Sequence, residues 1–196
     1  MKRIAETHAR VMWAMGIREE DIVFIGSFFS LYWGSWGTLL GAERLGAVAF
    51  PFGAGVAGQT ERALEWMAEV KPTVFYGTPS YSLYLAEKAK AKGLDPAKDF
   101  NFRILFFSGE PGAGVPSTKN RIEETFGGIC LDSGSTAEMS PWMTAGECSH
   151  RQGMHLWQDV VFAELVDPVT RKRVPDGAEG VTVYTHLAVS YTHLRA

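Results

Sequence analysis

Two short polar segments carry side chains suited to holding a charged small molecule. Residues Ser108–Gly114, with the sequence SGEPGAG, follow the apolar run at 104–107, and Asp132–Glu138, with the sequence DSGSTAE, follow the apolar run at 129–131. Short apolar runs bounded by turn residues are typical of buried strands in a parallel sheet. Because open α/β sheets bind ligands at the carboxyl ends of their strands, we predict that these two loops hold a nucleotide between them.

The chemistry available in the two segments differs. The glycines of the first let backbone groups approach a flat ligand, although an ordinary Gly- and Pro-rich turn explains that segment equally well. In the second, Asp132 can accept a hydrogen bond from an exocyclic amine, and Glu138 can bind a Mg²⁺ ion that bridges phosphate oxygens. Glu138 can also simply balance the dipole at a helix N-terminus. Hydroxyls for phosphate come from Ser133, Ser135 and Thr136.

A second cluster raises the question of zinc. Cys148, His150 and His155 lie within eight residues, and Cys148 and His155 are two potential ligands of a structural Zn²⁺ ion. Two or three ligands do not complete a site, so a remote residue such as His186 would have to join them. A loop thiol beside solvent-exposed histidines explains the same pattern. His8 is far from every one of these segments, and we expect it at the surface.

Composition narrows the class of protein. The chain has 196 residues, enough for one well-buried domain, and a net charge of -3, which does not favour nucleic acid or anionic lipid as a partner. No apolar stretch has the roughly 18 to 20 residues that a membrane span needs. Two cysteines and a charged N-terminus favour a reducing compartment, so we expect a cytoplasmic protein that binds small molecules. The oligomeric state stays open.

Hydrophobic periodicity predicts alternating strands and helices over the first 130 residues. Strands are expected over 22–29, 47–51, 73–76, 104–107 and 129–131, and helices over 3–15, 38–45, 60–70, 79–92 and 117–126. The aromatic and Gly-rich stretch at 30–37 is expected to be a loop. This order predicts an α/β fold, with a mainly parallel sheet, flanking helices and right-handed crossovers.

The chain changes character beyond Glu138. Strand-like runs at 154–157, 160–166 and 180–187 predict a β-rich segment, in which the last two runs form a hairpin-like pair. Tyr184–Leu187, with the sequence YTHL, is repeated at Tyr191–Leu194. A repeat this short does not build a solenoid, so we interpret residues 188–196 as a non-native tail or an assembly scar.

Seven short motifs occur in a fixed order along the chain. They are GTPSY at 77–81, SGEPGA at 108–113, D-x5-E at 132–138, GEC at 146–148, G-x-H-x-W at 153–157, D-P-x-T at 167–170 and PDG-x-x-G at 175–180. This ordered set resembles the phenylacetate–CoA ligase family, a branch of the adenylate-forming enzymes, up to about Leu187. Such acid–thiol ligases activate a carboxylic acid with ATP to an acyl-adenylate and then pass the acyl group to coenzyme A.

The resemblance implies roles for matching positions. It places ATP or AMP against Ser108, Gly109, Glu110, Pro111, Asp132, Ser133, Gly134, Ser135 and Thr136. In this arrangement Asp132 reads the adenine amine, and Glu138 is the catalytic residue that binds Mg²⁺ or the phosphates. The acyl group, expected to be an aryl acid such as phenylacetate, is placed against Tyr32, Trp33, Tyr76, Gly77, Thr78, Pro79 and Ser80.

The sequence also departs from the family pattern. The aromatic residue that stacks on adenine is replaced by Gly134, and the phosphate-binding loop, the ribose-binding Asp and the small Lys-bearing domain are missing. We therefore expect residues 1–187 to be a partial AMP-binding N-terminal domain, a fragment that does not turn over alone. The alternative is a non-catalytic nucleotide- or acyl-binding module, or a pseudogene product.

Overall fold

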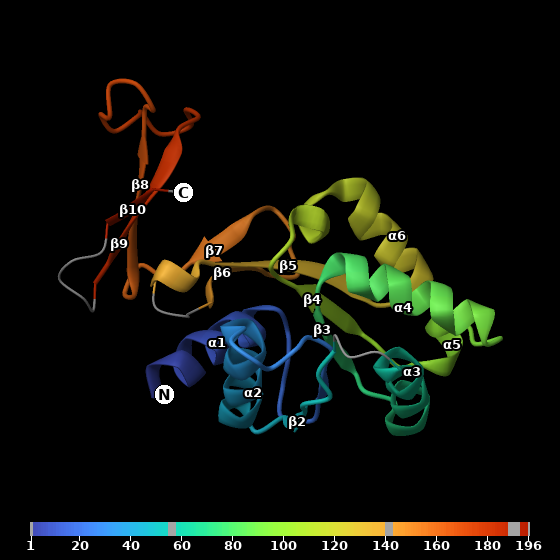
Figure 1. Ribbon diagram of the computed structural model, residues 1–196. Coiled ribbons are helices and arrows are strands. Elements are labelled where there is room, and N and C mark those ends of the chain that lie inside the picture. Colours follow the sequence, from blue (N-terminus) through green and yellow to red (C-terminus); the bar gives the residue numbers. More distant parts are fainter. Residues whose placement is uncertain (1, 55–57, 140–142, 188–192, 196) are drawn as a thin grey trace.

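A seven-stranded sheet with helices on both faces forms the body of the computed structural model, which describes residues 2–54, 58–139, 143–187 and 193–195 (Figure 1). Its strands are β1 (Ile22–Ile25), β2 (Val48–Phe50), β3 (Val74–Gly77), β4 (Ile104–Phe107), β5 (Ile129–Ser135), β6 (Met143–Glu147) and β7 (Met154–Leu156). The helices are α1 (Lys2–Ala14), α2 (Trp33–Leu45), α3 (Gln59–Val70), α4 (Pro79–Ala91), α5 (Pro96–Asp99) and α6 (Pro116–Phe126), with the short 3₁₀ helices η1 (Pro111–Gly114) and η2 (Ala137–Met139).

The spatial strand order is β2-β1-β3-β4-β5-β6-β7. The pairs from β2 to β5 are parallel, whereas β5 with β6 and β6 with β7 are antiparallel. The β-branched and aromatic residues of β1, β3 and β4 suit buried strands, which are covered on both faces. The predicted α/β fold with a mainly parallel sheet is therefore confirmed.

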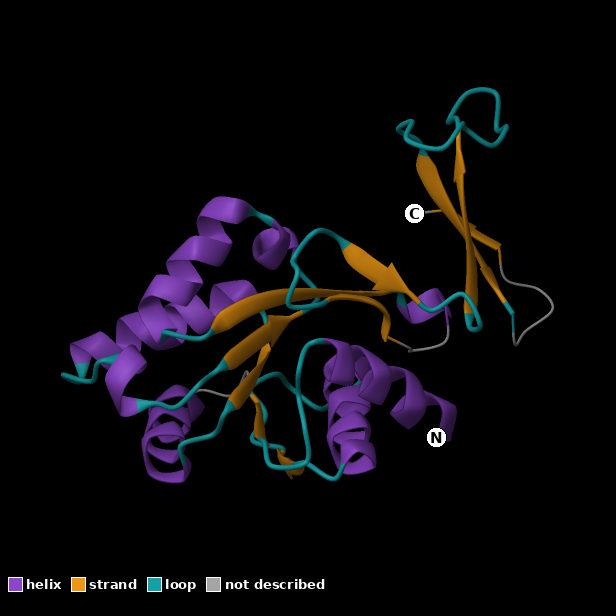
Figure 2. Ribbon diagram, turned by 180° about the vertical axis from the view of Figure 1, so that it is seen from behind, coloured by secondary structure: helices purple, strands orange, loops and turns teal. Residues whose placement is uncertain are grey.

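The sheet separates two hydrophobic cores (Figures 1 and 2). Along β4, Leu105 and Phe107 pack with α3, α4 and α6, while Ile104 and Phe106 pack with α1 and α2. Successive side chains of a strand point to opposite faces, so each buried strand supplies both cores. This alternation also decides on which face each residue near a strand's end lies.

Local signals define several helix ends. Pro79 begins α4, and the Thr78 hydroxyl caps it by accepting a hydrogen bond from Tyr81 N at 3.4 Å. Gly46 ends α2 with φ 83° and Gly127 ends α6 with φ 75°, the left-handed conformation that glycine adopts without a steric penalty. These boundaries agree with the sequence-based prediction.

The start of α2 was predicted wrongly. Residues 33–37 were expected in a loop, but the helix begins at Trp33. Gly37 faces α1, and a Cβ atom there would overlap the His8 imidazole, so the glycine allows the two helices to pack closely. His8 is only 1% exposed and its Nδ1 bonds to Ile4 O at 2.9 Å, so the surface position expected for it is also wrong. Burial lowers the pKa of His8 to about 4, which keeps it neutral.

The end of β5 was also predicted too short. Asp132–Ser135 were expected in a loop, but β5 continues to Ser135 because β6, which the sequence pattern did not indicate, pairs with it in antiparallel register. Ser133 pairs with Gly146 and Gly134 with Ala145, and the register shifts between Gly134 and Ser135. The polar residues of this segment therefore lie on a strand rather than on a free loop.

The remaining strands form a second sheet of β8 (Val161–Val166), β9 (Val181–His186) and β10 (His193–Arg195), in the order β10-β9-β8. The antiparallel pairing of β8 with β9 confirms the predicted hairpin-like pair. This sheet extends away from the body (Figures 1 and 2). Most side chains of β8 and β9 are half-buried, whereas Phe162 and Leu165 are exposed. Of the predicted non-native tail, 188–192 and 196 lie outside the described residues, and the prediction is not tested. Within the described part of the chain, no helix has the length and apolarity needed to cross a bilayer.

Candidate functional site

The winding direction of the sheet reverses between β1 and β3. The chain crosses from β1 to β2 through α2 on one face of the sheet and from β2 to β3 through α3 on the other. In doubly wound sheets, ligands bind where the winding direction reverses in this way. The segments at the carboxyl ends of β1, β3 and β4 therefore lie at the candidate site. The predicted acyl-binding residues belong to the first two of these segments, from Tyr32 and the start of α2 to the end of β3 and the first turn of α4.

Three hydroxyl groups meet at this reversal point. Ser108 Oγ lies 2.6 Å from the Tyr76 hydroxyl and 2.8 Å from the Tyr32 hydroxyl, and the two tyrosine oxygens are 3.2 Å apart. Burial, with a further contribution from Tyr32, raises the pKa of Tyr76 well above its ordinary value, so the Tyr76 hydroxyl stays protonated. Ser108, predicted to border adenine, therefore lies with the tyrosines predicted to line the acyl pocket.

A carboxylate connects the loop after β4 to the helix after β3. Glu110 accepts a hydrogen bond from Ser80 N at 3.1 Å and another from Ser80 Oγ at 2.7 Å. Ser80 lies in the first turn of α4, where unpaired N–H groups and the helix dipole favour a negative charge. The predicted nucleotide loop and the predicted acyl loop are therefore held together.

The backbone at Gly109 explains why this loop is rich in small residues. Gly109 has φ +84°, and a Cβ atom there would lie 3.3 Å from the Tyr32 hydroxyl, so both its conformation and its space favour glycine. Pro111 starts η1 directly afterwards. Gly77 ends β3, and Trp33, at the first position of α2, is 43% exposed.

Asp132 lies on the other face of the sheet. Its Oδ2 atom is 3.0 Å from the position that a Cβ atom on Gly114 would occupy, so the carboxylate borders η1. Burial, followed by the charge of Glu147, raises the pKa of Asp132 to about 6, while the Ser133 backbone hydrogen bond and the charge of Lys119 oppose that shift. An acceptor for an amine therefore stands apart from the hydroxyl cluster.

The other residues of the segment at 132–138 differ in how freely their side chains can bind a ligand. Ser133 Oγ donates to Phe107 O at 2.7 Å, so its single hydroxyl proton is already used and a phosphate would need another donor. The main-chain carbonyl of Gly134 accepts a hydrogen bond from the Thr144 hydroxyl at 3.3 Å. Ser135 and Glu138 are exposed, and Thr136 is half-buried. The exposed Glu138 carboxylate is a suitable oxygen ligand for Mg²⁺.

Gly134 is the position at which the resemblance led us to expect an aromatic ring. A Cβ atom there would meet Met154 Sδ at 3.4 Å and Ala145 Cβ at 3.5 Å, which are ordinary contact distances. The space beside Gly134 is thus lined by the side chains of β6 and β7.

Metal ligands for zinc are not gathered in the described part of the chain, where no group of three or more His, Cys, Asp or Glu side chains is arranged to hold a metal ion. Cys148 is half-buried, His155 is exposed, and His186 belongs to the second sheet. The zinc and magnesium predictions stay predictions.

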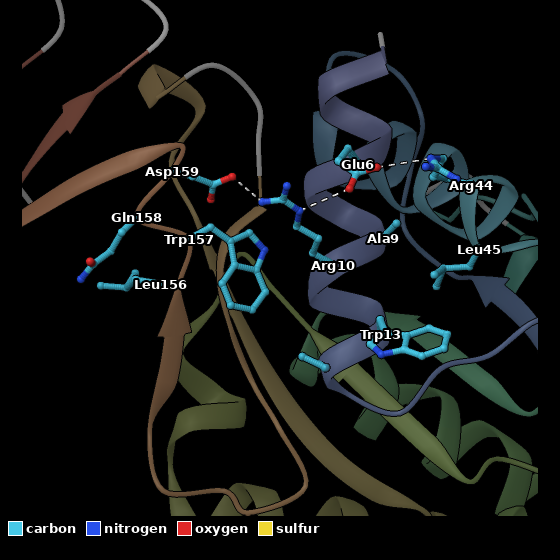
Figure 3. Close-up of a pocket in the computed structure, with 11 residues that line it drawn as sticks. Glu6, Ala9, Arg10, Trp13, Arg44, Leu45, Leu156, Trp157, Gln158 and Asp159 are labelled. Atoms are coloured by element: carbon cyan, nitrogen blue, oxygen red, sulfur yellow. Dashed lines mark hydrogen bonds and ion pairs between the residues drawn. The ribbon is translucent and has the colours of Figure 1, made fainter.

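A groove of about 590 Å³ lies between α1 and the segment that follows β7 (Figure 3). Trp13 and Trp157 contribute apolar surface, and the ion pairs of Arg10 with Asp159 at 2.6 Å and with Glu6 at 3.3 Å border it. No predicted site residue lines this groove. It is separate from the candidate site at the strand ends.

Two charged residues near Asp132 were missed by sequence reasoning. Lys119 and Glu147 form an almost fully buried ion pair, with Lys119 Nζ 2.8 and 2.6 Å from the two carboxylate oxygens. Glu147 belongs to the GEC motif, which was a signal, but nothing in the pattern of α6 distinguished Lys119 from a solvated lysine.

The sequence and the fold of the chain were compared with those of known proteins. No family model matches the chain. The phenylacetate-coenzyme A ligase of Pseudomonas putida is 34% identical to it over 185 residues, which are 94% of this chain and 41% of that protein. The phenylacetate-coenzyme A ligase of Aromatoleum evansii is 31% identical over 180 residues, 91% of this chain and 40% of that protein. Over this segment, the chain is related to the phenylacetate–coenzyme A ligases.

This family resemblance covers only part of each ligase, since the chain spans about 40% of the length of the curated relatives it matches. Among solved structures, an open conformation of a 2-hydroxyisobutyryl-CoA ligase in complex with 2-HIB-AMP and CoA superimposes with a TM-score of 0.89 at 53% identity, covering 94% of this chain and 40% of that one. A benzoate CoA ligase from Burkholderia xenovorans LB400 has a TM-score of 0.69 at 22% identity, covering 94% of this chain and 37% of that one, a likeness of fold. The predicted fold of an adenylate-forming ligase is confirmed.

Proposed function

We propose that residues 1–187 are part of the adenylation domain of a carboxylate–coenzyme A ligase. Such an enzyme uses ATP to convert an acid to an acyl-adenylate and then transfers the acyl group to the thiol of coenzyme A. The observation that carries this proposal is the Ser108 hydroxyl, which joins Tyr32 and Tyr76 in one cluster at the reversal point of the sheet. That cluster brings the loop assigned to the nucleotide against the loops assigned to the acid.

In each step of the reaction, residues of this chain would position the reactants rather than form covalent bonds with them. A carboxylate oxygen of the acid attacks the α-phosphorus of ATP and pyrophosphate leaves; the coenzyme A sulfur then attacks the acyl carbon and AMP leaves. Asp132 would accept a hydrogen bond from the adenine amine. The phosphates would lie against Ser135, Thr136 and Glu138. Mg²⁺, when bound at Glu138, would neutralise phosphate charge.

Two classes of acid are candidates. The aromatic rings of the loop after β1, including Phe28 and Phe29, favour an aryl acid. One such acid is phenylacetate, after which the related ligases are named. The relative with 53% identity was solved with 2-HIB-AMP, and the hydroxyl cluster of Tyr32, Tyr76 and Ser108 would suit a short 2-hydroxy acid. A site built to bond a hydroxyl rejects an analogue that lacks it far better than an apolar wall rejects a methylene.

The cellular setting is a proposal as well. Cys130 and Cys148 are both free thiols, which suits the reducing cytoplasm, where ATP and coenzyme A are available. Small molecules are the proposed partners.

Calorimetric titration of AMP into the purified chain tests nucleotide binding directly. Pyrophosphate release, measured with the chain and with any longer product of the same gene, tests adenylation of phenylacetate, benzoate, 2-hydroxyisobutyrate and isobutyrate. A signal with one class of acid supports the ligase and assigns the acid. Binding of AMP without pyrophosphate release from either preparation would instead support a non-catalytic binding module, and absence of both would refute the nucleotide site.

A further inference from the structure

Glu147 extends the pairing of β5 with β6 by means of its side chain. The backbone ladder between these strands starts at Ser133 and Gly146, one residue inside Asp132 and Glu147. At the next position Glu147 Oε2 accepts a hydrogen bond from Asp132 N at 2.8 Å. The main chain that carries the Asp132 carboxylate is therefore held by another carboxylate.

Lys119 supplies the positive charge that this arrangement needs. Its ammonium group donates to both oxygens of Glu147, at 2.8 and 2.6 Å, and the two residues are only 9% and 8% exposed. Removing one member of a buried ion pair leaves an uncompensated charge, which is costly. Lys119 comes from α6, so the pair also connects that helix to β6.

The charges that act on Asp132 come from two elements. Glu147 on β6 disfavours its ionised form, and Lys119 on α6 favours it. Glu123, also on α6, accepts a hydrogen bond from Cys130 N at 2.8 Å and pairs with Arg151 at 2.8 Å. Burial raises the pKa of the Cys130 thiol to about 12, so this neighbour on β5 is neutral. Lys119 is thus the cation that balances two nearby carboxylates.

We propose that Lys119 and Glu147 form a positioning pair for Asp132, in which Glu147 holds the Asp132 main chain and Lys119 lets both carboxylates carry their charge. The inference rests on the proposed function, because it assigns the pair to recognition of a nucleobase amine. An ionised carboxylate accepts from the amine of adenine, whereas a protonated one donates to the carbonyl oxygen that replaces this amine in hypoxanthine. The pair would therefore select AMP over IMP.

Two substitutions should move the titration of Asp132 in opposite directions. Lys119→Met removes the balancing cation and should raise the midpoint above about 6 by a unit or more. Glu147→Gln keeps an oxygen for Asp132 N but removes the competing charge, so the midpoint should fall. Glu123→Gln is the matched control, an identical chemical change on α6, and should leave the midpoint unchanged. A residue with only a structural role would not produce this pattern.

The midpoint is measured by carbon-13 NMR of the side-chain carboxyl groups of the chain, with Asp132→Asn to assign the signal. Affinities for AMP and IMP are measured by calorimetry at pH 7 and pH 9. Since each unit of pKa changes the ratio of ionised to protonated carboxyl tenfold, Lys119→Met should reduce the preference for AMP about tenfold at pH 7. At pH 9 the preference should return, and Lys119→Arg should retain it at both values.

Equal midpoints in wild type and Glu147→Gln, or an AMP preference that Lys119→Met leaves unchanged, would overturn the proposal. If Lys119→Met does not fold, Lys119→Arg and Glu147→Gln still decide the proposal, through the midpoint of Asp132 and the preference for AMP measured at pH 7. If the wild-type chain binds neither nucleotide, the nucleotide part of the proposed function fails, while the opposed midpoints still test whether the pair controls the charge of Asp132.

Discussion

The carboxylate of Glu110 binds the first turn of α4 through both the backbone N–H and the hydroxyl of Ser80, at 3.1 and 2.7 Å. These two residues are thirty positions apart, and each belongs to a different predicted binding loop. Their contact makes the two loops one unit, because movement of either would break two hydrogen bonds to a helix N-terminus.

Replacing Glu110 by alanine should lower the free energy of unfolding by about 1 kcal/mol, since a charged acceptor at a helix N-terminus is lost. Urea denaturation measures this change, and AMP affinity should fall with it because the loops separate. Glu110→Gln keeps one oxygen acceptor, so its free energy of unfolding should lie between those of wild type and Glu110→Ala. Equal stability of Glu110→Ala and wild type would show that the contact is not formed in solution.

Ser108→Ala should destabilise the chain by about 1 to 2 kcal/mol, because the buried Tyr76 hydroxyl loses its shortest hydrogen bond. A double-mutant cycle with Tyr76→Phe isolates the contact. The two substitutions should be less than additive, since removing both partners leaves no unpaired hydroxyl between them. Strictly additive changes in the free energy of unfolding, measured by thermal or urea denaturation, would show that the two hydroxyl groups do not interact.

Gly37→Ala should cost about 1 to 3 kcal/mol, because the added methyl group overlaps the buried His8 ring between α1 and α2. Gly134→Ala is the matched control, where the added carbon meets Met154 and Ala145 at ordinary contact distances. That variant should lie within about 0.5 kcal/mol of wild type in denaturant unfolding. A milder effect at Gly37 than at Gly134 would refute the close helix packing.

Asp21 should make the chain sensitive to acid. Burial opposes its ionisation, but hydrogen bonds from Arg103, Thr73 and Arg18 outweigh burial and hold the pKa of Asp21 below 3.8. Its stabilising contribution is present above pH 3.8 and is lost as pH falls through the lower native value. Asp21→Asn should cost about 2 kcal/mol at pH 7 and flatten the stability profile below pH 4, which denaturation at a series of pH values measures. An unaltered profile would exclude this role.

Asp132 should have the opposite effect on stability. Its pKa is raised from 3.8 to about 6, so the protonated carboxyl favours the folded state, and that contribution is lost as pH rises through 6. Asp132→Asn should remove this decline between pH 4 and 6 in the same denaturation series. A decline of the same size in the variant would assign it to another group.

Much of the fold could be predicted from local signals. Pro79 and Gly127 delimit helices through backbone preferences that need no distant partner, and the alternation of apolar runs with helical periods predicts the parallel sheet. The start of α2 could not be predicted this way. Gly37 indicated a loop by its own preference, but packing of α1 through His8 makes glycine necessary inside the helix.

The candidate site shows the same division. The order and spacing of the motifs were sufficient to indicate the ligase family, because residue types and their spacing are properties of the chain alone. The motifs did not indicate on which face of the sheet each residue lies, since that depends on where each strand ends and what pairs with it. In the folded chain Ser108 bonds to the tyrosines on one face of the sheet, and Asp132 borders Gly114 on the other.

The order of strands and helices, several helix ends and the small, polar character of the two loops follow from the amino-acid sequence, because they depend on backbone conformation and on periodicity over a few residues. The buried ion pair of Lys119 and Glu147, which are twenty-eight positions apart, arises from the tertiary structure, which brings α6 and β6 together, and Glu147 also bonds to Asp132 N. The charge of a buried carboxyl is set by desolvation and by its neighbours in space, and neither can be inferred from distance along the chain.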